Sequence, residues 1–116
     1  MTPSAVAALI DHTLLKPDTP QTGVEQLCDE AAEFKFATVC INPTWVKLAY
    51  EQLRSTQVGV CAVVGFPFGA NTTDLKRHEA ERVIQDGASE VDMVMNVGAL
   101  RSGDLNLFED DIGNVV

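Results

Sequence analysis

The chain repeats one pattern four times, in which a short apolar run is followed by a polar segment whose apolar residues recur about every 3.6 positions. The apolar runs are rich in β-branched residues and predict strands, whereas the polar segments predict amphipathic helices. The expected strands are residues 9–11, 37–41, 58–64 and 90–95. Because the last three are almost continuously apolar, we expect parallel strands that are covered on both faces.

Capping residues mark where the helices should begin. Thr19 is a candidate N-cap for the first helix, with Pro20 at its first position. Asn42 and Pro43 repeat that arrangement in the second helix. The third and fourth helices are expected over residues 73–86, before Gly87, and from Asp104 onward. The inward stripes of the second and third helices are Val46, Ala49, Tyr50 and Leu53, and Ala80, Val83 and Ile84.

Four consecutive βα units of this α/β class fit two architectures. One is an open, doubly wound parallel sheet, and the other is half of a (β/α)8 TIM barrel, whose usual size of roughly 250 residues is about twice this chain. No linker or low-complexity tract interrupts residues 1–116, so we expect a single domain. The pattern alone does not choose between the two architectures.

Composition disfavours several classes of partner. The 116 residues are 46% hydrophobic, but no stretch approaches the roughly 18 apolar residues of a membrane span. The net charge of −9 disfavours nucleic acids and anionic membranes. Three cysteines in apolar contexts, and a start that does not resemble a signal peptide, are typical of a reduced, cytoplasmic protein.

The motifs predict neither a metal nor a cofactor. His12 and His78 are far apart in the sequence, and CxxC and HExxH motifs are absent. Residues 65–69 carry glycines at turn positions but match neither GxGxxG nor the end of a P-loop. No nucleophile elbow supports a Ser-His-Asp triad.

Asp92 interrupts the apolar run 91–95 with a carboxylate. If both faces of this strand are buried, an unpaired carboxylate is costly, so Asp92 needs a partner, a raised pKa or a catalytic task. A structural hydrogen-bond acceptor is the alternative.

Other polar residues should gather with Asp92 at the carboxyl ends of the parallel strands, where α/β folds place their sites. They are Asp11, His12 and Thr13 after the first strand, Cys40 and Asn42 at the second, residues 65–69 after the third, and Asn96 after the fourth. Three of them have a plainer alternative: Asp11 can bond to backbone amides, His12 can be a packed or surface histidine, and Cys40 can be an inert core thiol.

Four segments, taken in order, resemble successive signatures of the deoxyribose-phosphate aldolase family. They are Ile-Asp-His-Thr-Leu-Leu-Lys-Pro at 10–17, Ala-Thr-Val-Cys-Ile-Asn-Pro at 37–43, Val-Gly-Phe-Pro-Phe-Gly-Ala at 64–70 and Gly-Ala-Ser-Glu-Val-Asp-Met-Val at 87–94. The resemblance covers roughly the first half of the family's barrel and so favours half of a (β/α)8 barrel. It implies cleavage of 2-deoxy-D-ribose 5-phosphate to acetaldehyde and glyceraldehyde 3-phosphate through a lysine Schiff base, without metal.

The resemblance also implies roles for individual residues. Asp92 matches the aspartate that acts in proton transfer at the Schiff-base site. Asp11 matches the aspartate that hydrogen-bonds within the catalytic lysine network. Thr13 and Cys40 match residues that line the substrate pocket.

One departure from the family is large. Its Schiff-base lysine, in a Lys-Thr-Ser-Thr-Gly strand, its second lysine and its phosphate-binding loops belong to the other half and have no counterpart in residues 1–116. The lysines present are Lys16, Lys35, Lys47 and Lys76, none of them inside an apolar strand. We therefore expect no activity from these residues alone. The alternative is a non-catalytic, self-assembling half-barrel module; in either case the unpaired strand edges predict a homo-oligomer.

Overall fold

The computed structural model describes residues 1–116, and its strands form one parallel sheet in the order β1-β2-β3-β4. The strands are β1 (Asp11–Leu14), β2 (Thr38–Ile41), β3 (Gly59–Val64) and β4 (Glu90–Met93). The helices are α1 (Pro3–Ala7), α2 (Gln21–Phe34), α3 (Val46–Leu53), α4 (Thr73–Gln85), α5 (Val97–Arg101) and α6 (Leu105–Val115), with a short 3-10 helix, η1 (Pro43–Trp45), before α3. Because each strand pairs with the next one along the chain and a helix follows each strand, the fold is a run of consecutive βα units.

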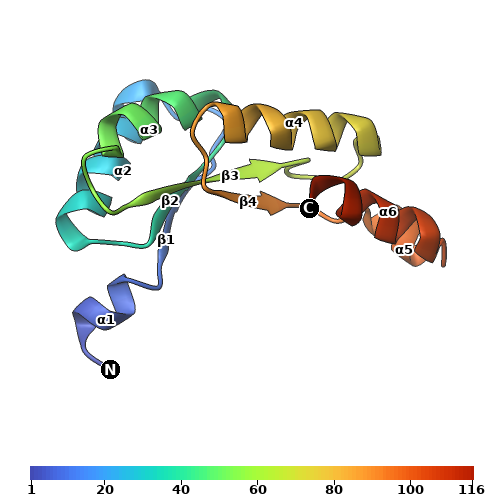
Figure 1. The fold of residues 1–116 in the computed structure, drawn as a ribbon, viewed down its shortest axis with the longest axis horizontal. Coiled ribbons are helices and arrows are strands. Elements are labelled where there is room, and N and C mark those ends of the chain that lie inside the picture. The colour runs from blue at the N-terminus through green and yellow to red at the C-terminus, as the bar shows by residue number, and fades with distance from the viewer.

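The main core lies between the sheet and α2, α3 and α4, which cover one of its faces (Figure 1). Val60, Ala62 and Val64 of β3 point into this core, whereas Cys61 and Val63 belong to a separate small cluster. Side chains alternate between the two faces of a strand, so this second cluster marks the opposite, inner face of the sheet.

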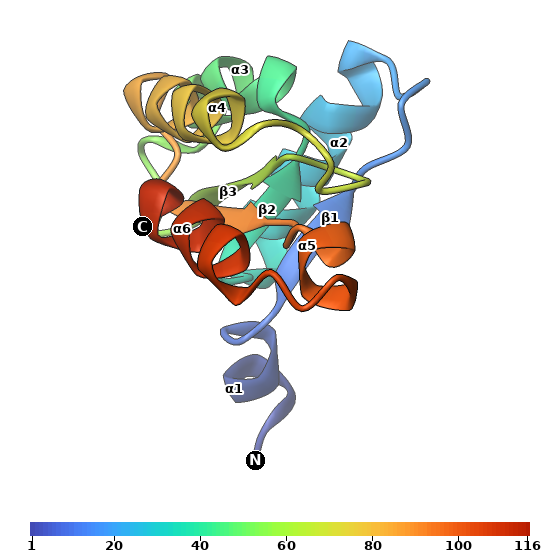
Figure 2. The ribbon, with the colours of Figure 1, turned by 90° about the vertical axis from the view of Figure 1, so that its right-hand side faces the viewer.

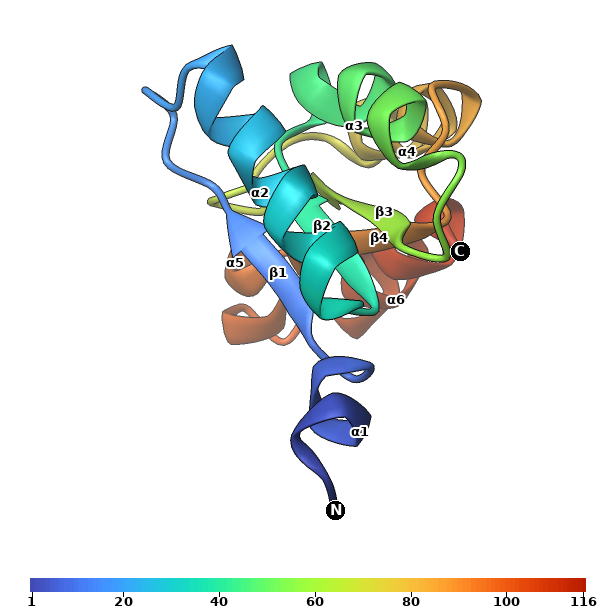
Figure 3. The same cartoon turned by 90° about the vertical axis from the view of Figure 1, so that its left-hand side faces the viewer.

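The remaining helices lie at the ends of the sheet. α1 contains no buried residue and extends away from the end at which β1 begins (Figure 3). α5 and α6 lie at the end toward which β3 and β4 point (Figures 1 and 2), and α6 packs against α4. None of the helices has both the length and the apolar character that crossing a membrane requires.

The first strand begins later than the sequence predicts. Residues 9–11 were expected as the strand, but β1 starts at Asp11 and continues to Leu14. The amides of Leu9 and Ile10 instead donate to Val6 and Ala7 and close the end of α1. Asp11 is therefore the first residue of β1 rather than its last.

The helix starts also differ from the prediction. The N-cap of α2 is Pro20, not Thr19, because the carbonyl of Pro20 accepts the first hydrogen bond of the helix, from Gly23. The predicted positions of Asn42 and Pro43 are confirmed, since Asn42 is the N-cap of η1 and Pro43 its first residue. The Asn42 side chain makes no capping bond, however; its Nδ2 donates to the Leu15 carbonyl at 3.2 Å. The prediction that Asp104 begins a helix is confirmed, since its side chain accepts from Leu107.

Burial confirms the predicted strands β2 and β3 and contradicts the prediction for β4. All of β2 is buried, whereas exposed and half-buried residues alternate in β4. β4 is an edge strand, and its exposed residues Glu90 and Asp92 alternate with half-buried Val91 and Met93, so its apolar sequence does not bury both faces. Two of the residues expected on inward helix stripes are exposed: Ile84, and Tyr50, whose ring lies over Gly87.

Candidate active site

The inner face of the sheet carries most of the polar residues that the sequence singled out. Val91 and Met93 pack against the helix-side core, so the side chain of Asp92 between them lies on the inner face. The strand register sets Thr13 beside Cys40 there. Asp92, Thr13 and Cys40 therefore share one face, but within the strands rather than beyond their ends.

Asp11 is held by a side chain of the neighbouring strand. Its Oδ1 accepts a hydrogen bond from the Thr38 hydroxyl at 2.7 Å, and the two residues are partners in the register of β1 and β2. Thr13 Oγ1 donates to the backbone carbonyl of Asp11 at 2.8 Å. The alternative of a backbone-amide acceptor thus does not describe Asp11, and Thr38 is a neighbour that sequence reasoning missed.

Asp92 is exposed, and this corrects the expectation of a buried carboxylate. Its side chain makes no hydrogen bond or ion pair within residues 1–116. The cost of burial that would require a partner is therefore absent in this half barrel. Asp92 is an open carboxylate on the inner face of β4, available to a group brought against that face.

Two thiols lie side by side between the carboxylates. Cys40 of β2 and Cys61 of β3 are register partners, and both are buried. A hydrogen bond from the Cys61 thiol lowers the pKa of Cys40, whereas burial and then the charges of Asp92 and Asp11 oppose the shift. The same hydrogen bond, followed by burial, raises the pKa of Cys61. Cys40, for which the sequence offered an inert core thiol as the plainer alternative, therefore has a neighbour that lowers its pKa.

His12 lies on the other face of the sheet. Its Nε2 is 3.3 Å from Glu30 Oε1, and its ring centroid is 4.8 Å from that of Phe36. The interpretation of His12 as a packed histidine is confirmed, and it takes no part in the inner face.

The loop after β3 and the turn after β4 are structural neighbours. Gly69 has a φ of 66°, and a Cβ atom there would lie 2.1 Å from the Met95 carbonyl oxygen. Only glycine permits this conformation together with such a close approach. Asn96 is the N-cap of α5, with its Oδ1 accepting from the Ala99 amide at 3.0 Å. Residue 69 and Asn96 thus shape the carboxyl end of the sheet.

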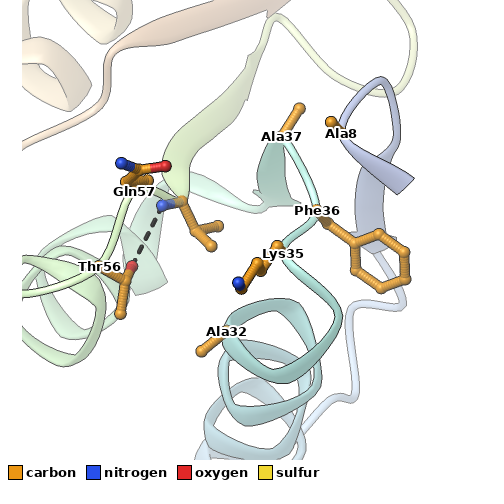
Figure 4. Close-up of a pocket in the computed structure, with 8 residues that line it drawn as sticks. Ala8, Ala32, Lys35, Phe36, Ala37, Thr56 and Gln57 are labelled. Atoms are coloured by element: carbon orange, nitrogen blue, oxygen red, sulfur yellow. Dashed lines mark hydrogen bonds between the residues drawn. The ribbon is translucent and has the colours of Figure 1, made fainter. Parts of the chain in front are cut away.

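Cavity size does not identify the site. A cavity of about 500 Å³ lies at the amino-terminal ends of the strands, where Lys35 is its only charged residue (Figure 4). A smaller groove of about 320 Å³ lies at the carboxyl ends, between Leu15, Asn42, Trp45 and Phe66. We assign the candidate site by its chemistry to the inner face, because the carboxylates of Asp11 and Asp92 and the thiols of Cys40 and Cys61 all lie on this face. No group of three or more His, Cys, Asp or Glu residues is arranged to hold a metal ion.

This inner face and the four βα units define half of a (β/α)8 barrel with a polar interior. The family model for DeoC/LacD family aldolases matches residues 5–116. Deoxyribose-phosphate aldolases from Bacillus cereus and Lactococcus lactis are 57% and 54% identical over 96% and 91% of this chain. The chain belongs to the DeoC/LacD aldolase family. It spans about half the length of these relatives, 50% and 48%.

Solved structures agree with this assignment. A protein from Coccidioides immitis assigned as a deoxyribose-phosphate aldolase superposes with a TM-score of 0.96 at 43% identity, over 99% of this chain and 46% of that one. The tetrameric deoxyribose-phosphate aldolase from Aeropyrum pernix superposes with a TM-score of 0.80 at 29% identity, over 95% and 50%. The prediction of a half barrel of the aldolase type is confirmed.

Proposed function

We propose that residues 1–116 form one domain that supplies the first half of the catalytic barrel of a deoxyribose-phosphate aldolase. The substrate would be 2-deoxy-D-ribose 5-phosphate, cleaved to acetaldehyde and glyceraldehyde 3-phosphate through a Schiff base. The observation that carries this proposal is the shared inner face of Asp11 and Asp92, with Thr13 on the same strand as Asp11 and Cys40 on the neighbouring strand β2. The 57% identity to a Bacillus cereus enzyme of that name supports the substrate class.

Asp92 is proposed as the residue that moves protons at the Schiff-base carbon. A general acid or base must reach the reacting group directly or through one water, and Asp92 is open to the inner face with no competing partner. Asp11 is proposed to orient the lysine network from the opposite edge strand, because its hydrogen bond from Thr38 fixes its direction.

Thr13 and Cys40 are proposed to line the substrate pocket. They are register partners on β1 and β2, and Cys40 lies within the electrostatic reach of both carboxylates. A three-carbon or two-carbon product held over this pair would sit between Asp11 and Asp92.

The nucleophilic lysine is proposed to come from the other half of the barrel. A Schiff-base lysine must be neutral to attack, which requires desolvation or a nearby cation. Lys16, Lys35 and Lys47 are exposed, and Lys76 is buried on the helix side with Asp111. None of the four lies in a strand of the sheet.

A chimera tests the proposal directly. Residues 1–116 would be joined to the second half of the Bacillus cereus relative, and cleavage of 2-deoxy-D-ribose 5-phosphate would be measured. We expect activity from the chimera, none from either half alone, and none from the chimera carrying Asp92→Asn. A folded chimera without activity would exclude the aldolase function for residues 1–116.

A self-assembling, non-catalytic module is the second candidate. The observation that favours it is the pair of free strand edges, on β1 and β4, which can pair with another copy. This alternative would be supported if residues 1–116 form a stable homo-oligomer and the chimera is folded but inactive. The three free thiols favour a reducing, cytoplasmic location in both cases.

A further inference from the structure

Lys76 is completely buried, although it belongs to the polar helix α4. Its Nζ donates to Asp111 Oδ2 at 2.5 Å and to the Val94 carbonyl at 3.0 Å. Asp111, on α6, is equally buried and accepts a second hydrogen bond from Thr73 Oγ1 at 3.0 Å. The ammonium group thus joins two helices to the backbone immediately after β4.

The hydrogen bond from Lys76 to the Val94 carbonyl lies close to Asp92. Val94 follows β4 directly and lies two residues after Asp92. Its amide donates to the Val64 carbonyl at 3.0 Å, so Lys76 fixes the second polar group of the same residue. Both ends of this peptide segment are therefore held, and with them the direction in which β4 leaves the sheet.

The same lysine contacts the loop after β3. A Cβ atom at Gly65 would lie 2.9 Å from Lys76 Cε, so the lysine stem fills the space beside this residue. One turn along α4, Glu79 Oε1 accepts from the Gly65 amide at 2.7 Å. α4 therefore contacts the backbone at the carboxyl ends of both β3 and β4.

A buried ion pair is not required for stability alone, because apolar residues of similar volume commonly replace one without loss. An apolar pair, however, cannot donate to the Val94 carbonyl. What Lys76 adds is direction: it selects one position for that carbonyl, and Asp111 holds the ammonium group in place.

We propose that Lys76 is a positioning residue whose pairing with Asp111 fixes the carboxyl end of β4 and thereby the direction of the Asp92 carboxylate, a role that rests on the function proposed above. Lys76 would not touch the substrate. It would act through the backbone of Val94 alone.

The test uses the aldolase chimera with Lys76→Met and Asp111→Leu combined, so that no buried charge is left unpaired. We expect kcat to fall by about tenfold to a hundredfold while KM stays within about twofold, since a misplaced catalytic group weakens the transition state rather than ground-state binding. Hydrogen exchange of the Val94 amide should accelerate. The matched control is Arg77→Met with Glu81→Leu, which removes an exposed ion pair from the same helix and should leave both quantities unchanged.

Three outcomes would overturn the positioning role. The first is an unchanged kcat in the apolar pair while Asp92→Asn lowers it, which leaves the proposed function intact. The second is an unchanged exchange rate of the Val94 amide. This result would exclude the positioning role even if the parent chimera is inactive and the proposed function has failed. The third is loss of folding in both the apolar pair and Lys76→Arg, because Lys76 would then be needed for the fold itself.

Discussion

The hydroxyl of Thr38 donates a 2.7 Å hydrogen bond to Asp11 and so joins the first residues of β1 and β2 across their register. Thr38 is buried, whereas Asp11 is exposed. A buried donor on one strand thus holds an exposed acceptor on the edge strand. This bond sets the direction of a carboxylate that we propose to be functional.

Thr38→Val removes the hydroxyl that donates to Asp11 and should lower the free energy of unfolding by about 1 kcal/mol. The loss is no larger because the Asp11 carboxylate is exposed, so that water replaces the lost donor. Urea unfolding at a fixed protein concentration measures the change. Thr22→Val, at an exposed position on α2, is the control and should cost less. Equal stability of the Thr38 variant and the parent would mean that the bond does not order β1.

Asp92→Asn should leave the free energy of unfolding within about 0.5 kcal/mol of the parent, because an exposed side chain without partners contributes little to stability. The same change should abolish turnover in the chimera. Asp18→Asn, at another exposed aspartate, should affect neither quantity. If Asp92→Asn unfolds the protein while turnover per folded molecule persists, its role is structural.

Residues 1–116 alone should yield no lysine adduct when incubated with substrate and borohydride. Three of the four lysines are exposed and the fourth is paired with Asp111, so none combines desolvation with a free amine. Mass spectrometry of a digest would detect an adduct. A specific adduct at Lys16, Lys35, Lys47 or Lys76 would contradict both this expectation and the proposed origin of the nucleophile.

The stability of the protein should decrease as the pH rises from about 9 to 11. Burial first, and then the charges of Asp29 and Glu25, raise the pKa of Cys28 from 9.0 to about 11. In this interval the folded state keeps a proton that the unfolded state has lost, so the contribution is present below pH 9 and is lost toward pH 11. It amounts to about 2 to 3 kcal/mol.

Cys28→Ala isolates this contribution. Unfolding free energies of the parent and the variant should differ in their slope against pH above pH 9, with the variant less steep. The other ionisable groups are common to both proteins and cancel in the comparison. Identical slopes would show that Cys28 ionises equally easily in the folded and unfolded states.

The sequence predicted burial correctly for the strands that lie in the middle of the sheet. β2 and β3 are apolar throughout and lie in the middle of the sheet, so pattern and structure agree. β4 has a similar pattern, but whether its inner face is covered depends on a neighbour that four βα units do not provide. The position of β1 was missed because Leu9 and Ile10 are used to close α1, a preference that apolar character does not reveal.

The site was predicted only in part, because the sequence shows which residues share a strand face but not which strands or helices become neighbours. Asp11, Thr13, Cys40 and Asp92 share a face, but Cys61 entered only through the register, which the sequence does not state. Lys76 could have been found: it precedes Ala80 and Val83 by four and seven positions, so it lies on their buried stripe. Its acidic partner could not have been found, because the pairing of α4 with α6 depends on the fold.

The free edges of the sheet predict that residues 1–116 alone form a discrete dimer or tetramer. β1 and β4 each pair on one side only, and exposed apolar residues such as Met95, Val97 and Leu100 follow β4. Unpaired strand edges invite pairing with another copy, while the net charge of −9 opposes open-ended growth. Two copies could pair their edges and approximate an eight-stranded barrel.

Light scattering at micromolar concentration measures the assembly state, and amide hydrogen exchange shows whether the edges take part. We expect slow exchange at β1 and β4 in the oligomer and faster exchange after dilution below its dissociation constant. Met93→Pro should disrupt edge pairing at β4, since proline has no amide to donate. The same substitution at Thr13 tests β1. A stable monomer with protected amides on both edge strands would contradict the prediction, because the half barrel would then be self-sufficient.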